Sequence, residues 1–159
     1  MSDFGSEVNG LEQRILILEP GVSIAQKKKE VIRMAKLHLV RHSEPAWRTE
    51  LPPSKWVLTG QGKIRSRELG VYLGKQGVSR IFSSDENKAV ETAEIAADVA
   101  GIKKVIIDSS LREHDRDNAP RPPNKKRDDL IIDCIRNPDK LIWGNETVSE
   151  ATNRFGEAV

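Results

Sequence analysis

The sequence predicts an α/β fold in which short parallel strands alternate with helices. Three observations support this prediction: short apolar runs typical of buried strands, helical stretches between them, and a glycine where each helical stretch ends. The order strand–helix–strand–helix–strand is typical of a doubly wound sheet with right-handed crossovers. We therefore expect a three-layer α/β/α arrangement around a mainly parallel sheet.

The first strand and helix of this alternation lie between residues 37 and 77. Residues 37–40 form a short apolar run, as in a buried parallel strand. After a proline-rich loop, Thr59 is placed to cap a helix that ends at Gly77. One face of this helix is predicted to carry the larger apolar side chains, namely Ile64, Leu69, Tyr72 and Leu73.

The second strand and helix follow directly. Residues 78–82 predict a strand, and the polar segment 83–85 predicts the cap of a helix that reaches about residue 100. Gly101 is a typical C-cap, and a third strand is predicted at 104–107. The inward side chains of the helix are predicted to be mostly Val90, Ala93, Ile95, Ala97 and Val99.

The remainder of the domain is a long loop followed by two helices. Residues 108–126 mix both charge signs with three prolines, and long loops of this kind are often functional. Helices are predicted at 128–136 and from about 146, where Asn145 or Thr147 can act as the cap. The alternation of strands and helices stops there.

Residues 1–33 differ from this pattern, and we treat them as an N-terminal extension of unknown role before a domain at 34–159. Residues 14–19 predict a short strand that ends at Pro20-Gly21. Residues 24–34 have a helix-like spacing, with three consecutive lysines that indicate a solvated face rather than a nucleic-acid patch.

Composition narrows the function classes. The chain has 26 basic and 24 acidic residues, and a net charge of +2 is too small to imply nucleic-acid binding. The single cysteine, Cys134, cannot form an internal disulfide. No apolar run has the length of a membrane span, and no signal peptide is recognised. We expect a cytoplasmic protein with neither a nucleic-acid nor a membrane partner.

A candidate site follows the first predicted strand. Arg41 and His42 stand where the chain leaves the carboxyl edge of the sheet, and open α/β sheets bind ligands at that edge. An imidazole can attack phosphorus, and a guanidinium can hold two phosphate oxygens. Alone, this pair of residues is a weak signal for phosphoryl chemistry.

Further segments stand in a defined order with this pair. They are Leu-Val-Arg-His-Ser-Glu at 39–44, Leu-Thr-Gly-Gln-Gly at 58–62, Ser-Ser-Asp-Glu-Asn-Lys-Ala-Val-Glu-Thr-Ala at 83–93, Leu-Arg-Glu at 111–113 and Gly-Asn-Glu-Thr at 144–147. In this order they resemble the motifs of the histidine phosphatase superfamily, which includes the cofactor-dependent phosphoglycerate mutases and many phosphatases. The resemblance implies a phosphoglycerate mutase-like fold.

The resemblance also implies roles for individual residues. His42 matches the histidine that attacks the phosphoryl group and forms a phosphohistidine, and Arg41 matches a phosphate-binding arginine. Lys88 stands where the family has a second basic residue, and Glu113 matches the acid that protonates the leaving oxygen. Positioning and positive charge are what phosphoryl transfer needs most, so no metal or organic cofactor is expected.

The chain departs from the family pattern at four points. Ser43 replaces a glycine, Lys88 replaces an arginine, and Arg48 replaces the asparagine that follows Trp47 in mutases. Arg48 could still meet an anionic substrate, but it argues against a true mutase. The family's second histidine belongs to a late strand that this sequence lacks. We therefore expect a sheet that is incomplete at its C-terminal end, with an unpaired edge.

Three functions stay open at this point. The first is a phosphohydrolase acting through His42 on a phosphorylated small molecule or phosphoprotein, with its activity as this chain in doubt. The second is a non-catalytic module that binds phosphate or a phosphorylated ligand, and the third is a phosphoglycerate mutase. Of the other histidines, we expect His38 to be structural and His114 to be an exposed loop residue.

Overall fold

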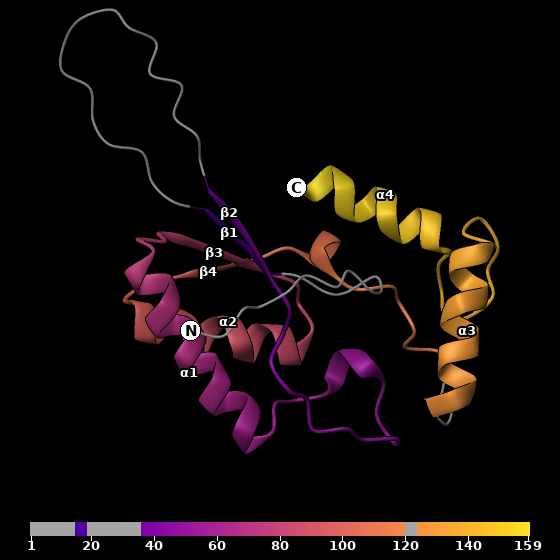
Figure 1. The fold of residues 1–159 in the computed structure, drawn as a ribbon, viewed down its shortest axis with the longest axis horizontal. Coiled ribbons are helices and arrows are strands. Elements are labelled where there is room, and N and C mark those ends of the chain that lie inside the picture. Colours follow the sequence, from indigo (N-terminus) through magenta and orange to yellow (C-terminus); the bar gives the residue numbers. More distant parts are fainter. Residues whose placement is uncertain (1–14, 19–35, 120–123) are drawn as a thin grey trace, which may run out of the picture.

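The computed structural model describes residues 15–18, 36–119 and 124–159 (Figure 1). The helix-like stretch predicted at 24–34, with its lysines, lies outside the described residues, as do the three prolines of the long loop. No helix within the described ranges combines the length and the apolar character that crossing a membrane requires.

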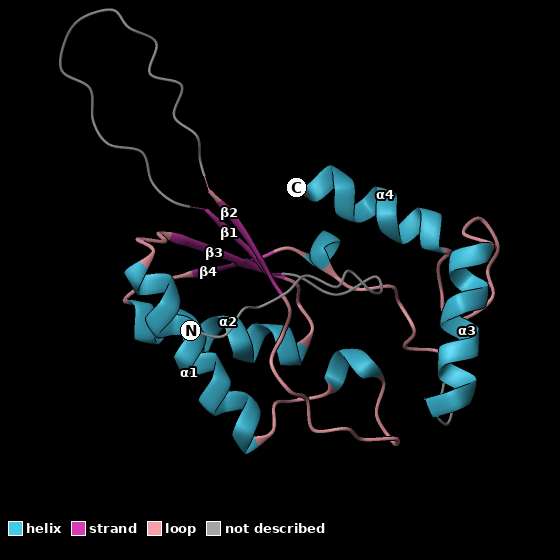
Figure 2. Cartoon of the chain, viewed as in Figure 1, coloured by secondary structure: helices cyan, strands magenta, loops and turns pink. Residues whose placement is uncertain are grey.

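A four-stranded sheet forms the centre of the fold, in the order β2-β1-β3-β4. Strands β2 (Leu37–Val40), β3 (Arg80–Ser83) and β4 (Val105–Ile107) run in one direction, and β1 (Ile15–Leu18) runs antiparallel to both of its neighbours. Figure 2 shows the strands together, with helices α1 and α2 below them. The prediction of an α/β fold with a mainly parallel sheet is confirmed.

Strand β1 corrects the expectation of an unpaired edge. The strand predicted at 14–19 forms, but it lies inside the sheet, where Leu16 is paired with Leu39 of β2 and with Phe82 of β3. An apolar Ile-Leu-Ile-Leu segment favours a strand, and each of its sides offers backbone donors and acceptors to a neighbour. The segment treated as an extension therefore contributes a central strand.

Helices α1 (Gly60–Lys75) and α2 (Asn87–Ala100) pack against each other, and α2 packs against β3 and β4 of the sheet. The Thr59 hydroxyl accepts a hydrogen bond of 2.9 Å from the Gly62 amide, as the predicted cap requires. Gly101 ends α2 in the left-handed conformation, with φ of 74°. The core lies between these helices and the sheet and includes Leu73, Val78, Ile81, Ala93, Ala96 and Ala97.

The contact between the two helices is made by small residues. A Cβ atom on Gly70 of α1 would lie 2.6 Å from the Ala96 carbonyl oxygen of α2, so the backbones approach too closely for larger side chains. Our prediction of large apolar side chains on this face was wrong for Ile64 and Tyr72, which are exposed, and Val99 of α2 is exposed too. Close helix packing selected glycine, serine and alanine instead.

Two single-turn 3₁₀ helices and two further helices complete the described chain. The 3₁₀ helices are η1 (Pro53–Lys55) and η2 (Ser109–Leu111), and the later helices are α3 (Asn124–Arg136) and α4 (Val148–Ala158). Thr147 caps α4 through a reciprocal capping box with Glu150. Helix α4 packs against η2, which places it beside the segment that follows β4.

Candidate active site

A cavity opens where the chain leaves β2, and it gathers four of the five residues selected from the sequence. Arg41 and His42 directly follow β2, Lys88 lies in the first turn of α2, and Glu113 follows η2. All four line the cavity together with Pro45, Trp47, Pro53, Trp56, Arg116, Ala119, Arg127 and Trp143. The topology thus joins segments that are far apart in the sequence.

His42 is held as a neutral imidazole with a defined tautomer. Its Nδ1 lies 2.7 Å from the backbone carbonyl oxygen of Ser43. Because a carbonyl oxygen only accepts, Nδ1 carries the proton and Nε2 keeps its lone pair. Burial, reinforced by the charge of Lys88, lowers the pKa of His42 from 6.5 to about 4 despite the opposing hydrogen bond to Ser43. At neutral pH the ring is therefore an uncharged base.

The loop that carries His42 is fixed to both helices. The Ser43 amide donates to the Thr92 hydroxyl of α2 at 3.0 Å, and that hydroxyl donates to the Lys88 carbonyl at 2.7 Å. The Glu44 carbonyl accepts from the Thr59 amide at 3.0 Å, and it lies so close to Gly62 that a Cβ there would overlap it. The glycine at the start of α1 therefore allows this loop to approach the helix.

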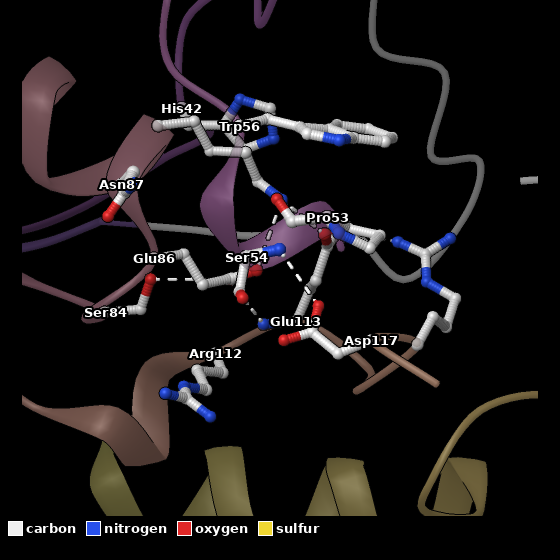
Figure 3. A network of polar contacts seen from close by, with 12 residues as sticks. His42, Pro53, Ser54, Trp56, Ser84, Glu86, Asn87, Arg112, Glu113 and Asp117 are labelled. Atoms are coloured by element: carbon white, nitrogen blue, oxygen red, sulfur yellow. Dashed lines mark hydrogen bonds and ion pairs between the residues drawn. The ribbon is translucent and has the colours of Figure 1, made fainter. Parts of the chain in front are cut away.

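Lys88 is the most deeply buried charge of the site, with 1% of its surface exposed. Among the described residues, its Nζ donates to Glu113 Oε1 at 2.7 Å, to the Pro53 carbonyl at 3.1 Å and to Glu86 Oε1 at 3.2 Å. Figure 3 shows Glu86, Pro53 and Glu113 converging on one point of this network. A buried ammonium needs such partners, because an isolated buried charge is very costly.

The pKa values of the two carboxylates in this network, Glu86 and Glu113, are shifted in opposite directions. Burial raises the pKa of Glu86, and the negative charge of Glu113 adds to this effect. Burial also opposes the charge of Glu113, but the ion pairs with Arg116, 2.8 Å from Oε2, and with Lys88 outweigh it and lower its pKa. Glu113 is therefore a carboxylate at neutral pH in the free protein.

Arg154 of α4 fixes the backbone around Glu113. Its guanidinium donates to the carbonyl oxygens of Ser110, Arg112 and Glu113 at 2.8, 3.0 and 3.1 Å. The same group pairs with Glu146 at 2.6 Å. One half-buried fork of donors thus links the last described helix to the segment that presents Glu113.

Two sequence expectations turn out differently in the structure. Arg48 does not line the cavity, and its guanidinium lies 3.6 Å from Glu50 in an exposed ion pair. The expectation that His114 is an exposed loop residue was wrong. His114 is half-buried and its Nε2 donates to the Glu146 carbonyl oxygen at 2.6 Å, so it braces the loop. His38 lies edge-on to Tyr72, with 5.9 Å between the ring centres.

Sequence reasoning missed several residues that contribute to the cavity. Arg116 lies three residues after Glu113, a spacing that brings opposite charges together in a turn. Trp56, Arg127 and Trp143 offer no comparable signal, because they belong to a loop, to the start of α3 and to the turn before α4. The role of Glu86 depends on its burial, which the sequence does not reveal.

Known proteins with similar sequences belong to the family that the motifs around this cavity resemble. A family model described as histidine phosphatase superfamily (branch 1) matches residues 37–159. A probable phosphoglycerate mutase GpmB from Salmonella paratyphi A is 35% identical over 137 residues, which cover 79% of this chain and 62% of that protein. Another from Enterobacter sp. (strain 638) is 34% identical over 85 residues, which cover 52% of this chain and 39% of that protein.

Solved structures show the same fold. A mycobacterial glucosyl-3-phosphoglycerate phosphatase in complex with inorganic phosphate has a TM-score of 0.57 and 18% identity, covering 92% of this chain and 60% of that one. The native structure of the same enzyme has a TM-score of 0.55 at 18% identity, covering 89% and 59%. The chain thus spans less than two thirds of the length of each of these proteins.

Proposed function

Because this chain belongs to the histidine phosphatase superfamily (branch 1), we propose that it is a phosphomonoesterase that works through a phosphohistidine on His42. One observation supports the proposal above the others. The Nδ1 proton of His42 is fixed on the Ser43 carbonyl and the ring pKa is lowered to about 4, so Nε2 offers a lone pair at neutral pH.

In the first half of the reaction, Nε2 of His42 attacks the phosphorus atom. The bond from phosphorus to the ester oxygen breaks, and the leaving oxygen takes up a proton and departs as an alcohol. Arg41, Lys88 and Arg116 lie around the cavity, where their charges offset the negative charge of the transferred group.

In the second half, water attacks the phosphohistidine and the phosphorus–nitrogen bond breaks, which releases phosphate and restores the imidazole. Glu113 is ionised in the free protein and can accept the proton of that water. To act as the acid in the first half it must first bind a proton. A bound phosphate dianion favours this, because a nearby negative charge raises the pKa of a carboxylate.

A second candidate function is phosphate binding without turnover. The observation in its favour is that Lys88 is already engaged by two carboxylates and a carbonyl, so it is less available to offset the charge of a transferred group, while Arg41 and Arg116 also line the cavity. A mutase is less favoured. The position that mutases fill with asparagine holds Arg48, whose guanidinium pairs with Glu50 away from the cavity.

The remaining expectations about partners stay predictions. They are a phosphorylated small molecule or phosphoprotein as substrate, no nucleic-acid or membrane partner, no cofactor and a cytoplasmic location. Arg48 as a substrate-binding residue also stays a prediction, which now requires its side chain to leave Glu50.

The test uses a generic aryl phosphate and inorganic vanadate with the wild-type chain and the His42→Asn variant. His38→Asn is the matched control, because this histidine lies against Tyr72 and does not line the cavity. We expect turnover by the wild type and the control and loss of at least about a thousandfold in His42→Asn. Rapid quenching in alkali should trap a phosphoenzyme only where His42 is intact.

Each result points to a definite conclusion. Equal rates in the wild type and His42→Asn would refute His42 as the nucleophile. Vanadate binding by calorimetry, with no turnover and no trapped phosphoenzyme in any variant, would favour the binding module. Absence of both turnover and vanadate binding would exclude both functions for this chain.

A further inference from the structure

All three tryptophans of the chain line the one cavity that contains His42. The chain has seven aromatic residues in total, with three phenylalanines and one tyrosine besides the tryptophans. Trp47, Trp56 and Trp143 come from the loop after β2, the segment after η1 and the turn before α4, and each lines this cavity. Phosphate chemistry alone does not need an indole ring.

Two of these rings form a stacked pair. The centroids of Trp47 and Trp56 are 6.1 Å apart and the ring planes differ by 13°. The Trp56 Nε1 proton is shared between the carbonyl oxygens of Arg48, at 2.8 Å, and Leu51, at 3.1 Å. Its polar edge is thus held by the loop, and the orientation of the ring is fixed.

This pair extends from the buried Lys88, which lies near Trp56, to the exposed Trp47. Lys88 Nζ lies 5.6 Å from the centre of the Trp56 ring, and Trp56 lines the same cavity as His42 (Figure 3). Trp47 is 55% exposed, although it is one of the largest apolar side chains. An exposed indole stacked on an ordered one presents an apolar surface in the cavity that contains His42.

The third ring is joined to the acidic side of the site. The Arg116 guanidinium lies 5.0 Å from the centre of the Trp143 ring, and the same guanidinium pairs with Glu113. Two aromatic surfaces therefore accompany the charged groups: the Trp47–Trp56 pair near Lys88, and Trp143 near Arg116 and Glu113.

On these observations we propose, on the basis of the proposed function, that the site selects phosphate monoesters whose leaving group is a ring with an apolar face, which stacks on the Trp47–Trp56 pair. Aromatic rings and the C–H faces of sugar rings share this chemistry. A favourable stack is expected to raise kcat/KM by about tenfold over an open-chain ester. Trp47 and Trp56 are thereby specificity-determining residues.

The experiment compares three esters of primary alcohols, so that the leaving groups have similar reactivity: benzyl phosphate, glucose 6-phosphate and n-butyl phosphate. We expect kcat/KM for at least one ring ester to exceed that for n-butyl phosphate by about tenfold. Trp47→Leu should bring this ratio close to one, and Trp47→Phe should largely restore it. Inhibition by inorganic phosphate should be the same in all three proteins, because phosphate has no ring.

A binding measurement separates this inference from the proposed function. Benzylphosphonate and methylphosphonate cannot be hydrolysed, and their affinities can be measured by calorimetry whether or not the protein is active. Tighter binding of benzylphosphonate, lost in Trp47→Leu, would support ring selection even if turnover is absent. No preference for any ring compound, either in rate among the three esters or in affinity between the two phosphonates, would overturn it. Preference for benzyl phosphate or for glucose 6-phosphate distinguishes an aromatic from a sugar ring.

Discussion

Replacement of Lys88 by methionine isolates the electrostatic role of the buried ammonium. Methionine keeps an unbranched side chain of similar length but removes the charge and its three donors. In Lys88→Met, the Glu86 carboxylate remains buried and that of Glu113 largely so, and the Pro53 carbonyl loses its bond from Nζ. Arg116 remains as a partner of Glu113, while Glu86 loses the partner that lies 3.2 Å away.

The expected cost follows from this burial. Removal of one partner of a buried ion pair typically costs about 3–5 kcal/mol, a large share of a total stability of about 5–15 kcal/mol. A surface pair is worth only about 0–1 kcal/mol. Lys63 supplies the matched control, because its Nζ lies 3.4 Å from Glu91 with both side chains partly exposed. Lys63→Met should therefore lose about 1 kcal/mol or less.

The destabilisation in Lys88→Met should also depend on pH. Lys88 lowers the pKa of both carboxylates, so without the ammonium the folded-state pKa of Glu86, which already lies above its unfolded value of 4.5, rises further. Between these two values the unfolded chain has released a proton that the folded chain retains. The free energy of unfolding therefore falls as pH rises through this window, and the loss is smaller at pH 5 than at pH 8.

Urea unfolding followed by circular dichroism at pH 5, 6, 7 and 8 measures this difference. The reasoning requires a loss in Lys88→Met that exceeds the loss in Lys63→Met and grows with pH. A loss of 1 kcal/mol or less, or a large loss that is the same at pH 5 and pH 8, would show that the buried carboxylates are not what the lysine compensates.

Three further predictions concern the histidine, one turn and the N-terminal strand. The His42 ring resonance should titrate near pH 4 in NMR, because burial disfavours the imidazolium. The stability that the lowered pKa contributes is complete above about pH 6.5 and falls as the pH drops toward 4. Titration of His42 near pH 6.5 would contradict this prediction. Gly144→Ala should lower the free energy of unfolding by about 1–3 kcal/mol, because φ is 101° and a Cβ would overlap the Asp115 carbonyl. Gly156→Ala, which meets open space in helix α4, should be neutral or stabilising by up to about 1 kcal/mol, and equal effects of the two substitutions in chemical denaturation would refute the reasoning. Removal of residues 1–33 should lower the free energy of unfolding by several kcal/mol, because β2 and β3 each lose their pairing with β1 and each lost hydrogen bond is worth about 1 kcal/mol. An unchanged midpoint of thermal unfolding would show that β1 does not stabilise the sheet.

Much of the fold was predictable because local signals and tertiary structure agree. Thr59 and Gly101 mark helix ends through backbone hydrogen bonding, which depends on a few neighbouring residues. The buried face of α1 was not predictable in the same way. Its glycine and serine residues are selected by the close approach of α2, and a hydrophobic pattern gives larger side chains more weight.

In the candidate site too, residues within sequence motifs could be predicted, whereas residues that act through burial or through contacts between loops could not. His42, Lys88 and Glu113 lie in ordered sequence motifs, so their assembly at one cavity could be anticipated. Glu86 and the tryptophans act through burial and through contacts between distant loops. Arg48 shows the converse, because its position next to Trp47 suggested substrate contact while its side chain pairs with Glu50.

The pairing of β1 also bears on the order in which the site assembles. Strands β2 and β3 have no ladder with each other in the described sheet, because both pair with β1. The antiparallel pairing of β1 with β2 joins strands that are neighbours in sequence, whereas the pairing of β1 with β3 joins strands that lie much further apart in the chain. Strand β3, followed by the helix that bears Lys88, can then dock on the exposed side of β1. Strand β1 thus joins the strand that leads to His42 with the strand that leads to the helix of Lys88, although its described residues 15–18 line no part of that cavity.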